Sequence, residues 1–193
     1  MSNPADLPLD PRSLDVGGAT DRLPGAIRID LDPRSRADVN HDLDVVPWPF
    51  PDSTFEFVRA FDVLDHVVDL EGCLKELHRI CQPGAAIHVR LPFLKGLRLA
   101  SDPAQRLVAT SRTFDPFDPT RGPGLGHAGA PFRLVAVHYE RGYTSSRLGR
   151  ALARVDRRLL PFLERHMVGY ELCFARLYPM HKVYYELRVV KGT

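Results

Sequence analysis

The stretch from Ser13 to Asp32 constrains the fold of this chain more than any other part of it. It consists of a short apolar run that ends at an acid, a glycine turn, and a second apolar run that ends at Asp30. A glycine turn after a first parallel strand lets backbone N–H groups approach a ligand closely, because glycine has no Cβ. An acid at the end of the next strand is well placed to accept hydrogen bonds from ribose hydroxyls. On its own, the stretch fits either such a site or a plain turn without a ligand.

The second strand follows the first too soon for a crossover helix. We expect strands at Ser13–Val16 and Ala26–Asp30, which are nine residues apart. A crossover helix between parallel strands takes about a dozen residues or more. The link is therefore expected to be a turn around Leu23-Pro24-Gly25.

Hydrophobic periodicity predicts how the chain continues. Over Asp69–Ile80 the apolar residues recur every three or four positions, which is typical of an amphipathic helix, and a Pro-Gly turn follows it. The prolines of Pro47–Asp52 exclude regular structure, and Arg34–Asp44 is expected to form a loop and a short strand. Further strands are expected at Phe55–Phe61, Ala85–Leu91, Phe132–Tyr139 and Lys182–Val190, and further helices at Ser145–Leu160 and Phe162–Tyr178. This alternation predicts an α/β sandwich with a mostly parallel sheet.

The length of the chain fits one domain over residues 1–193. Residues 1–11 are expected to form a flexible arm. Residues 93–130 carry many prolines and glycines and are expected to form an insertion that covers a substrate. Within it, residues 120–130 fit either a lid or a disordered segment.

Composition narrows the class of protein. The chain is 44% hydrophobic and 26% charged, contains no apolar run of membrane-spanning length, and begins with polar, proline-rich residues. A cytoplasmic protein is therefore expected, without membrane partners, and the helix at Ser145–Leu160 is expected to pack on the sheet rather than lie on a membrane. Three widely spaced cysteines, Cys73, Cys81 and Cys173, fit buried thiols better than disulfides or a zinc site, so no metal is expected.

Charge is distributed unevenly along the chain although the net charge is only +2. Residues 1–72 hold fifteen acids against six bases, whereas residues 141–193 hold eleven bases against four acids. The basic C-terminal part fits either a solvated helix face or contact with an anionic partner.

Four segments together resemble the class I S-adenosylmethionine-dependent methyltransferases, in particular small bacterial members of the type 11 group. They are LDVGGAT, RIDLDP, HDLDVVPWPFPDSTFEFVRAFDVLDHV and CLKELHRICQPGAAIHVRLP, in the order and spacing of that family. The tail YPMHKVYYELRVVKG resembles the closing strand of a subgroup that also shortens the link between its first two strands. The resemblance implies a Rossmann-like sandwich with a mostly parallel sheet and an antiparallel closing strand.

The resemblance also implies the residues of a cofactor site for S-adenosylmethionine. These are Asp15, Gly17, Gly18, Ala19, Asp30, Leu31, Asp42 and Leu43. Among them, Asp30 would accept from the ribose hydroxyls and Asp42 from the adenine amino group. Asp62 would lie near the methyl-bearing sulfonium, and His66 would either touch the acceptor or cap the following loop. Catalysis is assigned to Asp62, His66, Asp102 and Arg106.

Four places depart from the family pattern, one of them Gln82-Pro83-Gly84-Ala85, where the family has KPGG. Ala19 stands where the family has a second glycine, Asp65 stands where it has Glu, and Gln105 stands where the related subgroup has His. Glutamine cannot accept a proton near neutral pH as histidine does. The departures indicate a relaxed or repurposed cofactor site.

Three functions remain open. The first is a small-molecule methyltransferase, expected to act in bacterial secondary metabolism. The second is an enzyme on the same fold that no longer uses the cofactor and catalyses an elimination or cyclisation, with Asp62, Asp102, Arg106 and Arg90 as candidates for proton transfer and anion binding.

The third function is a non-catalytic partner subunit, which would need an apolar surface on the C-terminal helices. Phe162, Phe174, Tyr178 and Tyr184 could supply one, although aromatics of this kind are expected in the core. Nucleic acid is not expected as a partner, because the net charge is small and no recognition domain is present. Homo- or hetero-oligomers stay open, and a nicotinamide site is disfavoured by the incomplete glycine fingerprint.

Overall fold

The structure is a computed structural model that describes residues 12–17, 22–93, 104–121, 130–141, 147–175 and 177–192. Side chains are described for all of these except residues 147–154. The expected arm at residues 1–11, and residues 94–103 and 122–129 of the expected insertion, lie outside the described part. The same holds for Gly18, Ala19 and Asp102.

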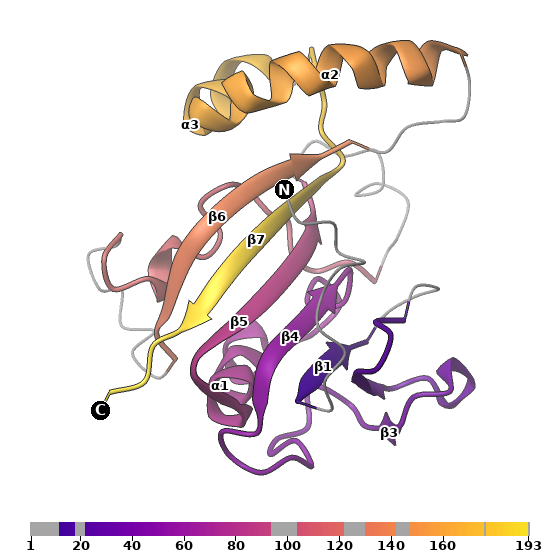
Figure 1. Ribbon diagram of the computed structural model, residues 1–193, viewed down its shortest axis with the longest axis vertical. Coiled ribbons are helices and arrows are strands. Elements are labelled where there is room, and N and C mark those ends of the chain that lie inside the picture. Colours follow the sequence, from indigo (N-terminus) through magenta and orange to yellow (C-terminus); the bar gives the residue numbers. More distant parts are fainter. Residues whose placement is uncertain are drawn as a thin grey trace.

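Seven strands form one sheet in the order β3-β2-β1-β4-β5-β7-β6 (Figure 1). The strands are β1 (Ser13–Val16), β2 (Ile27–Asp30), β3 (Val39–Asn40), β4 (Phe55–Phe61), β5 (Cys81–Pro92), β6 (Phe132–Glu140) and β7 (Lys182–Val189). Neighbouring strands from β3 to β5 pair in parallel, whereas β7 is antiparallel to both β5 and β6. The expected α/β sandwich with an antiparallel closing strand is confirmed.

Helix α1 (Leu70–Ile80) covers one face of the sheet and lies behind it in Figure 1. The Asp69 carboxylate accepts a hydrogen bond from the Gly72 N–H and caps the helix at its N-terminus. Cys73, Leu74, Leu77 and Ile80 form its buried stripe, as the periodicity predicts. They pack with the alternate buried residues of β4, β5 and β7 in one continuous apolar core.

Helix α2 (Arg147–Arg165) continues without interruption through Pro161, where the sequence predicts a break between two helices. Pro161 is exposed, on the side of the helix where a proline ring meets no packed neighbour. The expected helix at Phe162–Tyr178 is wrong in its bounds: α2 ends at Arg165, and short turns α3 (Met167–Gly169) and η5 (Tyr170–Phe174) follow.

Two further expectations for this region are wrong. Cys73 and Cys81 are buried thiols as expected, but Cys173 is exposed. Phe162 and Phe174, expected in the core, are also exposed; between residues 166 and 175 only Tyr170 and Ala175 are buried. Within the described residues, the structure contains no helix long and apolar enough to cross a membrane.

Candidate functional site

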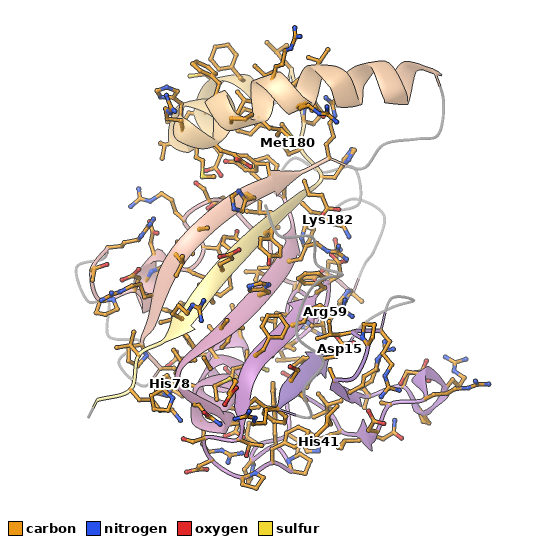
Figure 2. All side chains as sticks on the ribbon, in the orientation of Figure 1. Asp15, His41, Arg59, His78, Met180 and Lys182 are labelled. Carbon is orange, nitrogen blue, oxygen red and sulfur yellow. The ribbon has the colours of Figure 1, made fainter. Side chains whose placement is uncertain are left out.

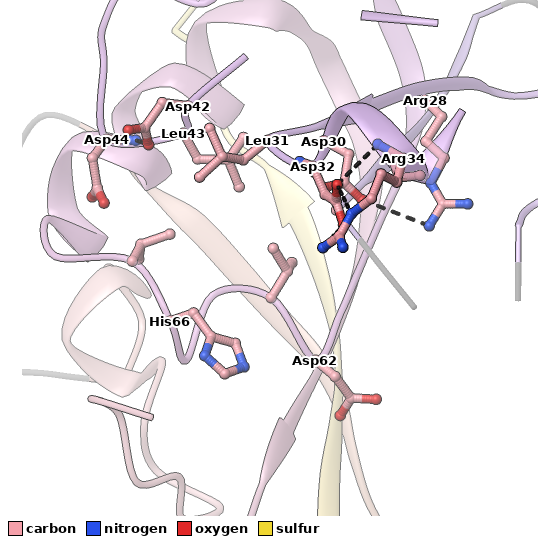
Figure 3. Close-up of a pocket in the computed structure, with 14 residues that line it drawn as sticks. Arg28, Asp30, Leu31, Asp32, Arg34, Asp42, Leu43, Asp44, Asp62 and His66 are labelled. Carbon is pink, nitrogen blue, oxygen red and sulfur yellow. Dashed lines mark hydrogen bonds and ion pairs between the residues drawn. The ribbon is translucent and has the colours of Figure 1, made fainter. Parts of the chain in front are cut away.

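A pocket of about 640 Å³ opens at the carboxyl ends of β1 to β4 (Figure 3). Each strand contributes the residues that directly follow or end it, as is usual for ligand sites in parallel sheets. The lining comprises Gly17 after β1, Arg28 and Asp30 of β2 with Leu31, Asp32, Arg34 and Ser35 after it, Asp42 to Asp44 after β3, and Asp62, Val63, His66 and Val67 after β4. The topology thus brings together seven of the residues assigned from the sequence: Gly17, Asp30, Leu31, Asp42, Leu43, Asp62 and His66.

Gly17 occupies a position that no other residue could take without strain. Its φ of +63° lies in the left-handed region. A Cβ built on it would stand 2.3 Å from Cγ2 of Val63, which belongs to the loop after β4. The turn after β1 and the loop after β4 therefore approach each other so closely that glycine is required.

Asp15 is buried in the sheet beside Arg59 (Figure 2) and is not among the residues that line the pocket. Its carboxylate accepts two hydrogen bonds from Arg59 of the neighbouring strand β4, at 2.8 and 3.0 Å, and one from the Leu23 N–H at 3.0 Å. Both members of this ion pair are almost fully buried. In this position, Asp15 holds the segment that leads into β2.

Asp30 ends β2 with its carboxylate at the pocket. One oxygen accepts from the Asp32 N–H at 2.9 Å, and the other lies 3.8 Å from an Arg28 guanidinium nitrogen. Asp32 in turn holds Arg34, whose hydrogen bonds keep the pKa of the Asp32 carboxyl below its usual value. This wall of the pocket therefore carries both acids and arginines.

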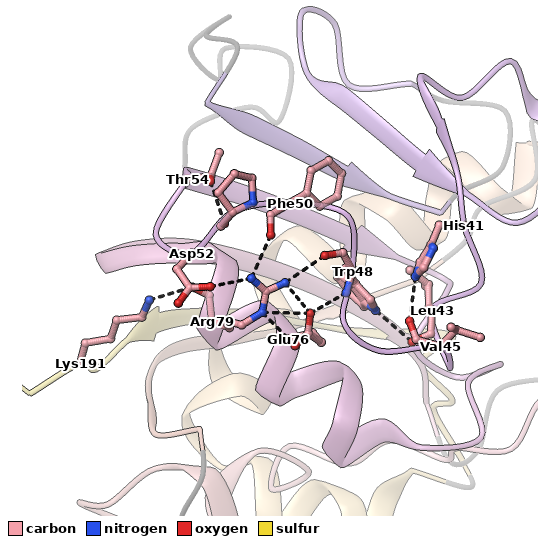
Figure 4. Close-up of polar contacts among 11 residues, drawn as sticks. His41, Leu43, Val45, Trp48, Phe50, Asp52, Thr54, Glu76, Arg79 and Lys191 are labelled. Atoms are coloured by element: carbon pink, nitrogen blue, oxygen red, sulfur yellow. Dashed lines mark hydrogen bonds and ion pairs between the residues drawn. The ribbon is translucent and has the colours of Figure 1, made fainter.

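The loop that carries Asp42 and Leu43 is fixed from beneath by α1 (Figure 4). The Trp48 indole N–H donates to the Leu43 carbonyl at 3.0 Å, and the Trp48 backbone N–H donates to Glu76 at 2.7 Å. Arg79 binds the same Glu76 carboxylate and donates to the carbonyls of Trp48 and Phe50. The proline loop is thus tied to the helix, and buried Leu43 is held against the pocket.

Asp62 lies where β4 ends and has a left-handed backbone, with φ of +53°. One of its carboxylate oxygens accepts from Arg90 of β5 at 2.6 Å and from Lys182 of β7 at 2.6 Å. Arg90 also lies over the ring of Phe61 at 4.4 Å. The pocket lining therefore contains a carboxylate, that of Asp62, which is held by two cationic side chains.

Asp65 and His66 follow in the same loop. The Asp65 side chain is 1% exposed, and neither of its carboxylate oxygens has a hydrogen-bond partner. Burial raises the pKa of the Asp65 carboxyl, an effect that His66, 3.5 Å away, partly offsets. The Asp65 backbone carbonyl accepts a hydrogen bond from the Arg106 N–H at 2.7 Å. The Arg106 side chain is exposed and lies outside the pocket lining.

Acids dominate the charge of the pocket. Its lining holds five aspartates, Asp30, Asp32, Asp42, Asp44 and Asp62, against two arginines, Arg28 and Arg34. An excess of carboxylates favours a cationic ligand or one that presents N–H and O–H donors. The sequence analysis did not assign seven residues of this lining, which are Arg28, Asp32, Arg34, Ser35, Asp44, Val63 and Val67, nor Lys182, which binds Asp62. Only Arg28 had a signal in the sequence, because it stands two positions before Asp30 and so shares its face of the strand.

Comparison with family models gives one match: residues 19–89 match a model described as a methyltransferase domain. Among curated proteins, a 41-residue segment is 39% identical to cycloartenol-C-24-methyltransferase of Arabidopsis thaliana. That segment is 21% of this chain and spans only 12% of the plant enzyme.

Similar solved structures extend the likeness to nearly the whole chain. A S-adenosylmethionine-dependent methyltransferase from Archaeoglobus fulgidus matches with a TM-score of 0.55 and 12% identity, over 92% of this chain and 85% of that one. The [4+2]-cyclase SpnF matches with a TM-score of 0.53 and 16% identity, over 95% of this chain and 76% of that one. At such identities the likeness shows the fold.

Proposed function

From its resemblance to the class I S-adenosylmethionine-dependent methyltransferases, we propose that this chain binds that cofactor and transfers its methyl group to a small molecule. The observation that carries the proposal is the acid-rich pocket at the carboxyl ends of β1 to β4. S-adenosylmethionine presents a sulfonium, an ammonium, two ribose hydroxyls and an adenine amino group, all of which a carboxylate can face favourably. The carboxylates of the pocket are therefore suited to the groups that this cofactor presents.

The residues take distinct roles in this proposal. Asp30 accepts from the ribose hydroxyls, and Asp42 accepts from the adenine amino group while the buried Leu43 packs against the ring. Gly17 lines the methionine end, with Gly18 and Ala19 predicted beside it, and Leu31 covers the ribose from the solvent side. Asp15 acts from outside the pocket lining by holding the segment after the glycine turn.

The bound cofactor supplies an electrophilic methyl group, so the protein has to orient the acceptor, exclude water and take up a proton. Asp62 lies at the mouth of the pocket, and Arg90 and Lys182 fix its carboxylate. His66, partly exposed in the same lining, is the candidate proton acceptor because a neutral imidazole nitrogen can accept a proton from a bound substrate. Asp102 and Arg106 stay as predictions for the acceptor side. We also propose that the enzyme works in the cytoplasm, in bacterial secondary metabolism.

A second function is favoured by the likeness to SpnF, which is a [4+2]-cyclase rather than a methyltransferase. In this alternative, the chain keeps the fold and the pocket but catalyses an elimination or cyclisation. Asp62 with its two cationic neighbours would then face the substrate directly.

Calorimetric titration distinguishes the two functions. The wild-type protein and Asp30→Ala are titrated with S-adenosylmethionine and with S-adenosylhomocysteine, and Glu71→Ala serves as a control that removes an exposed carboxylate far from the pocket. We expect micromolar binding that Asp30→Ala weakens by about tenfold to a hundredfold, since a hydrogen bond to a charged group contributes roughly 1.5–3 kcal/mol. Absence of binding to either compound would exclude the methyltransferase and leave the alternative.

A further inference from the structure

Large apolar side chains are exposed on the C-terminal helical layer, which α2, α3, η5 and the residues directly after them form. Leu172 and Leu177 are 80% and 81% exposed. Phe162, Val168 and Phe174 are also exposed, and these five side chains fall within 16 residues. Figure 1 shows the layer, α2 with α3 at its end, lying beyond one end of the sheet. We call these five residues the apolar patch.

The charges exposed beside the patch are all cationic. Arg157, Arg158 and Arg165 are exposed along α2. Among the side chains described between residues 155 and 177, none of the exposed ones is acidic. A solvated helix face would carry both signs, so this surface is not an ordinary one.

The three acids of the same region all turn toward the body of the protein. Asp156 is buried and lies 3.5 Å from Arg141. Glu164 accepts from the Tyr139 N–H at 3.1 Å. Glu171 accepts from the Ser111 N–H at 2.6 Å and from the Tyr139 hydroxyl at 2.9 Å. Through these contacts the three acids bind the layer to the body of the protein. The apolar residues of the patch and the arginines beside it stay exposed to solvent.

On the inner side of the layer, side chains already pack against the rest of the described chain. The Tyr170 ring stacks on Phe93, which follows β5, and the Tyr170 hydroxyl donates to the Tyr178 carbonyl at 2.7 Å. Phe93 lies at the carboxyl end of β5, and Tyr139 lies near the carboxyl end of β6. The layer therefore stands at the edge of the sheet at which the pocket opens.

We propose that the apolar patch, with its flanking arginines, binds the interface of an anionic lipid bilayer. Large apolar side chains beside arginines, without exposed acids, are the combination that inserts into the headgroup region and attracts anionic lipids. A second copy of the chain fits less well, because a twofold contact through this face would bring arginines against arginines. Bilayer binding would hold the carboxyl edge of the sheet toward the membrane.

Vesicle co-sedimentation of the full chain tests the proposal. The probes are phosphatidylcholine vesicles with and without about one third phosphatidylglycerol. We expect binding to the anionic vesicles that added salt weakens. The double variant Leu172→Glu, Leu177→Glu should lose about tenfold or more in affinity, because it removes two insertable side chains. Arg158→Gln and Arg165→Gln should each weaken the affinity for anionic vesicles about fivefold. Neither substitution should change the affinity for phosphatidylcholine vesicles.

Val45→Glu is the matched control, since Val45 is an exposed apolar residue far from the layer, and it should bind as the wild type does. Circular dichroism confirms that each variant folds. Failure of the wild type to bind anionic vesicles would overturn the proposal, as would binding that the two leucine substitutions leave unchanged. A dimer that dissociates in the leucine variant, without vesicle binding, would assign the patch to a second copy instead.

Discussion

Gly17 connects the turn after β1 to the loop after β4. Its left-handed backbone and the Val63 methyl that occupies the space of a Cβ are two independent reasons for glycine. The sequence indicates the first reason through the Gly-Gly turn. It cannot indicate the second, because Val63 is 46 positions away. The position therefore matters for the structure before any ligand is considered.

Gly17→Ala should destabilise the protein by about 3 kcal/mol, through left-handed strain and displacement of Val63. Gly84→Ala is the matched control, because Gly84 has φ of +77° but nothing within 4 Å of its added Cβ. That variant should lose only about 1 kcal/mol. Urea unfolding measures both, and equal losses would mean that the contact with Val63 is unimportant.

Asp65 is a buried acid without a hydrogen-bond partner, and Gln105 nearby has an unpartnered carbonyl oxygen. Burial raises the pKa of Asp65, so the folded protein holds this proton more tightly than the unfolded chain does. The stability contributed by this group therefore falls as pH rises above the unfolded pKa of about 3.9.

Asp65→Asn should accordingly raise the free energy of unfolding at pH 7 by about 1 kcal/mol, because it removes a buried charge and adds an amide donor. The gain should vanish near about pH 4, where the carboxyl is protonated in both states. Asp38→Asn should behave in the opposite sense, since hydrogen bonds from Arg22 lower the pKa of Asp38. Urea unfolding at several pH values measures both, and a gain for Asp65→Asn that is independent of pH would contradict the account.

At the scale of elements, α1 is the support of the pocket as well as a cover for the sheet. Its inner stripe is buried, and its Glu76 and Arg79 hold the proline loop, whose Trp48 in turn donates to the Leu43 carbonyl. The periodicity of the sequence predicts the helix and its buried stripe. The role of Glu76 is hidden there, because its partner Trp48 lies 28 positions earlier in a segment without periodicity.

Glu76→Ala should lower the free energy of unfolding by about 2–3 kcal/mol, because the Trp48 N–H is left unpaired in a buried place and Arg79 loses its main partner. Hydrogen bonds from Arg79 lower the pKa of Glu76, so this stability is present above the unfolded pKa and lost as pH falls. The difference in the free energy of unfolding between Glu76→Ala and the wild type should therefore become smaller at acidic pH.

Glu71→Ala on the same helix is the control for this substitution. Glu71 and Lys75 form an exposed pair at 2.8 Å, which contributes no more than about 0.5 kcal/mol. Thermal or urea unfolding of the two variants should separate them clearly. Similar losses in both would show that the link between α1 and the proline loop adds little.

At the scale of the whole molecule, local patterns predicted most elements and the resemblance predicted their arrangement. The strands from Ser13–Val16 to Phe55–Phe61 and the helix after them agree with the structure within a residue or two. The continuation of α2 through Pro161 was not predictable, because only its exposure makes the proline tolerable. The apolar patch was missed for a related reason: periodicity shows that a helix has an apolar face but not whether anything covers it.

The site was predictable only where a residue ends a strand. Asp30, Asp42 and Asp62 stand at or near strand ends in the sequence, and the topology brings them to one pocket. Contacts between distant segments could not be predicted, such as Lys182 with Asp62 across 120 positions or Arg59 with Asp15 across 44. These pairs depend on the strand order β1-β4-β5-β7, which local patterns do not specify.

The crystal structure of the protein with S-adenosylhomocysteine would test the central claim most directly. The account predicts ribose hydroxyls at the Asp30 carboxylate, the adenine amino group at Asp42 with the ring on Leu43, and the sulfur directed toward Asp62. Density for the compound at any other place, or an empty pocket at saturating concentration, would contradict the claim that this fold retains its cofactor.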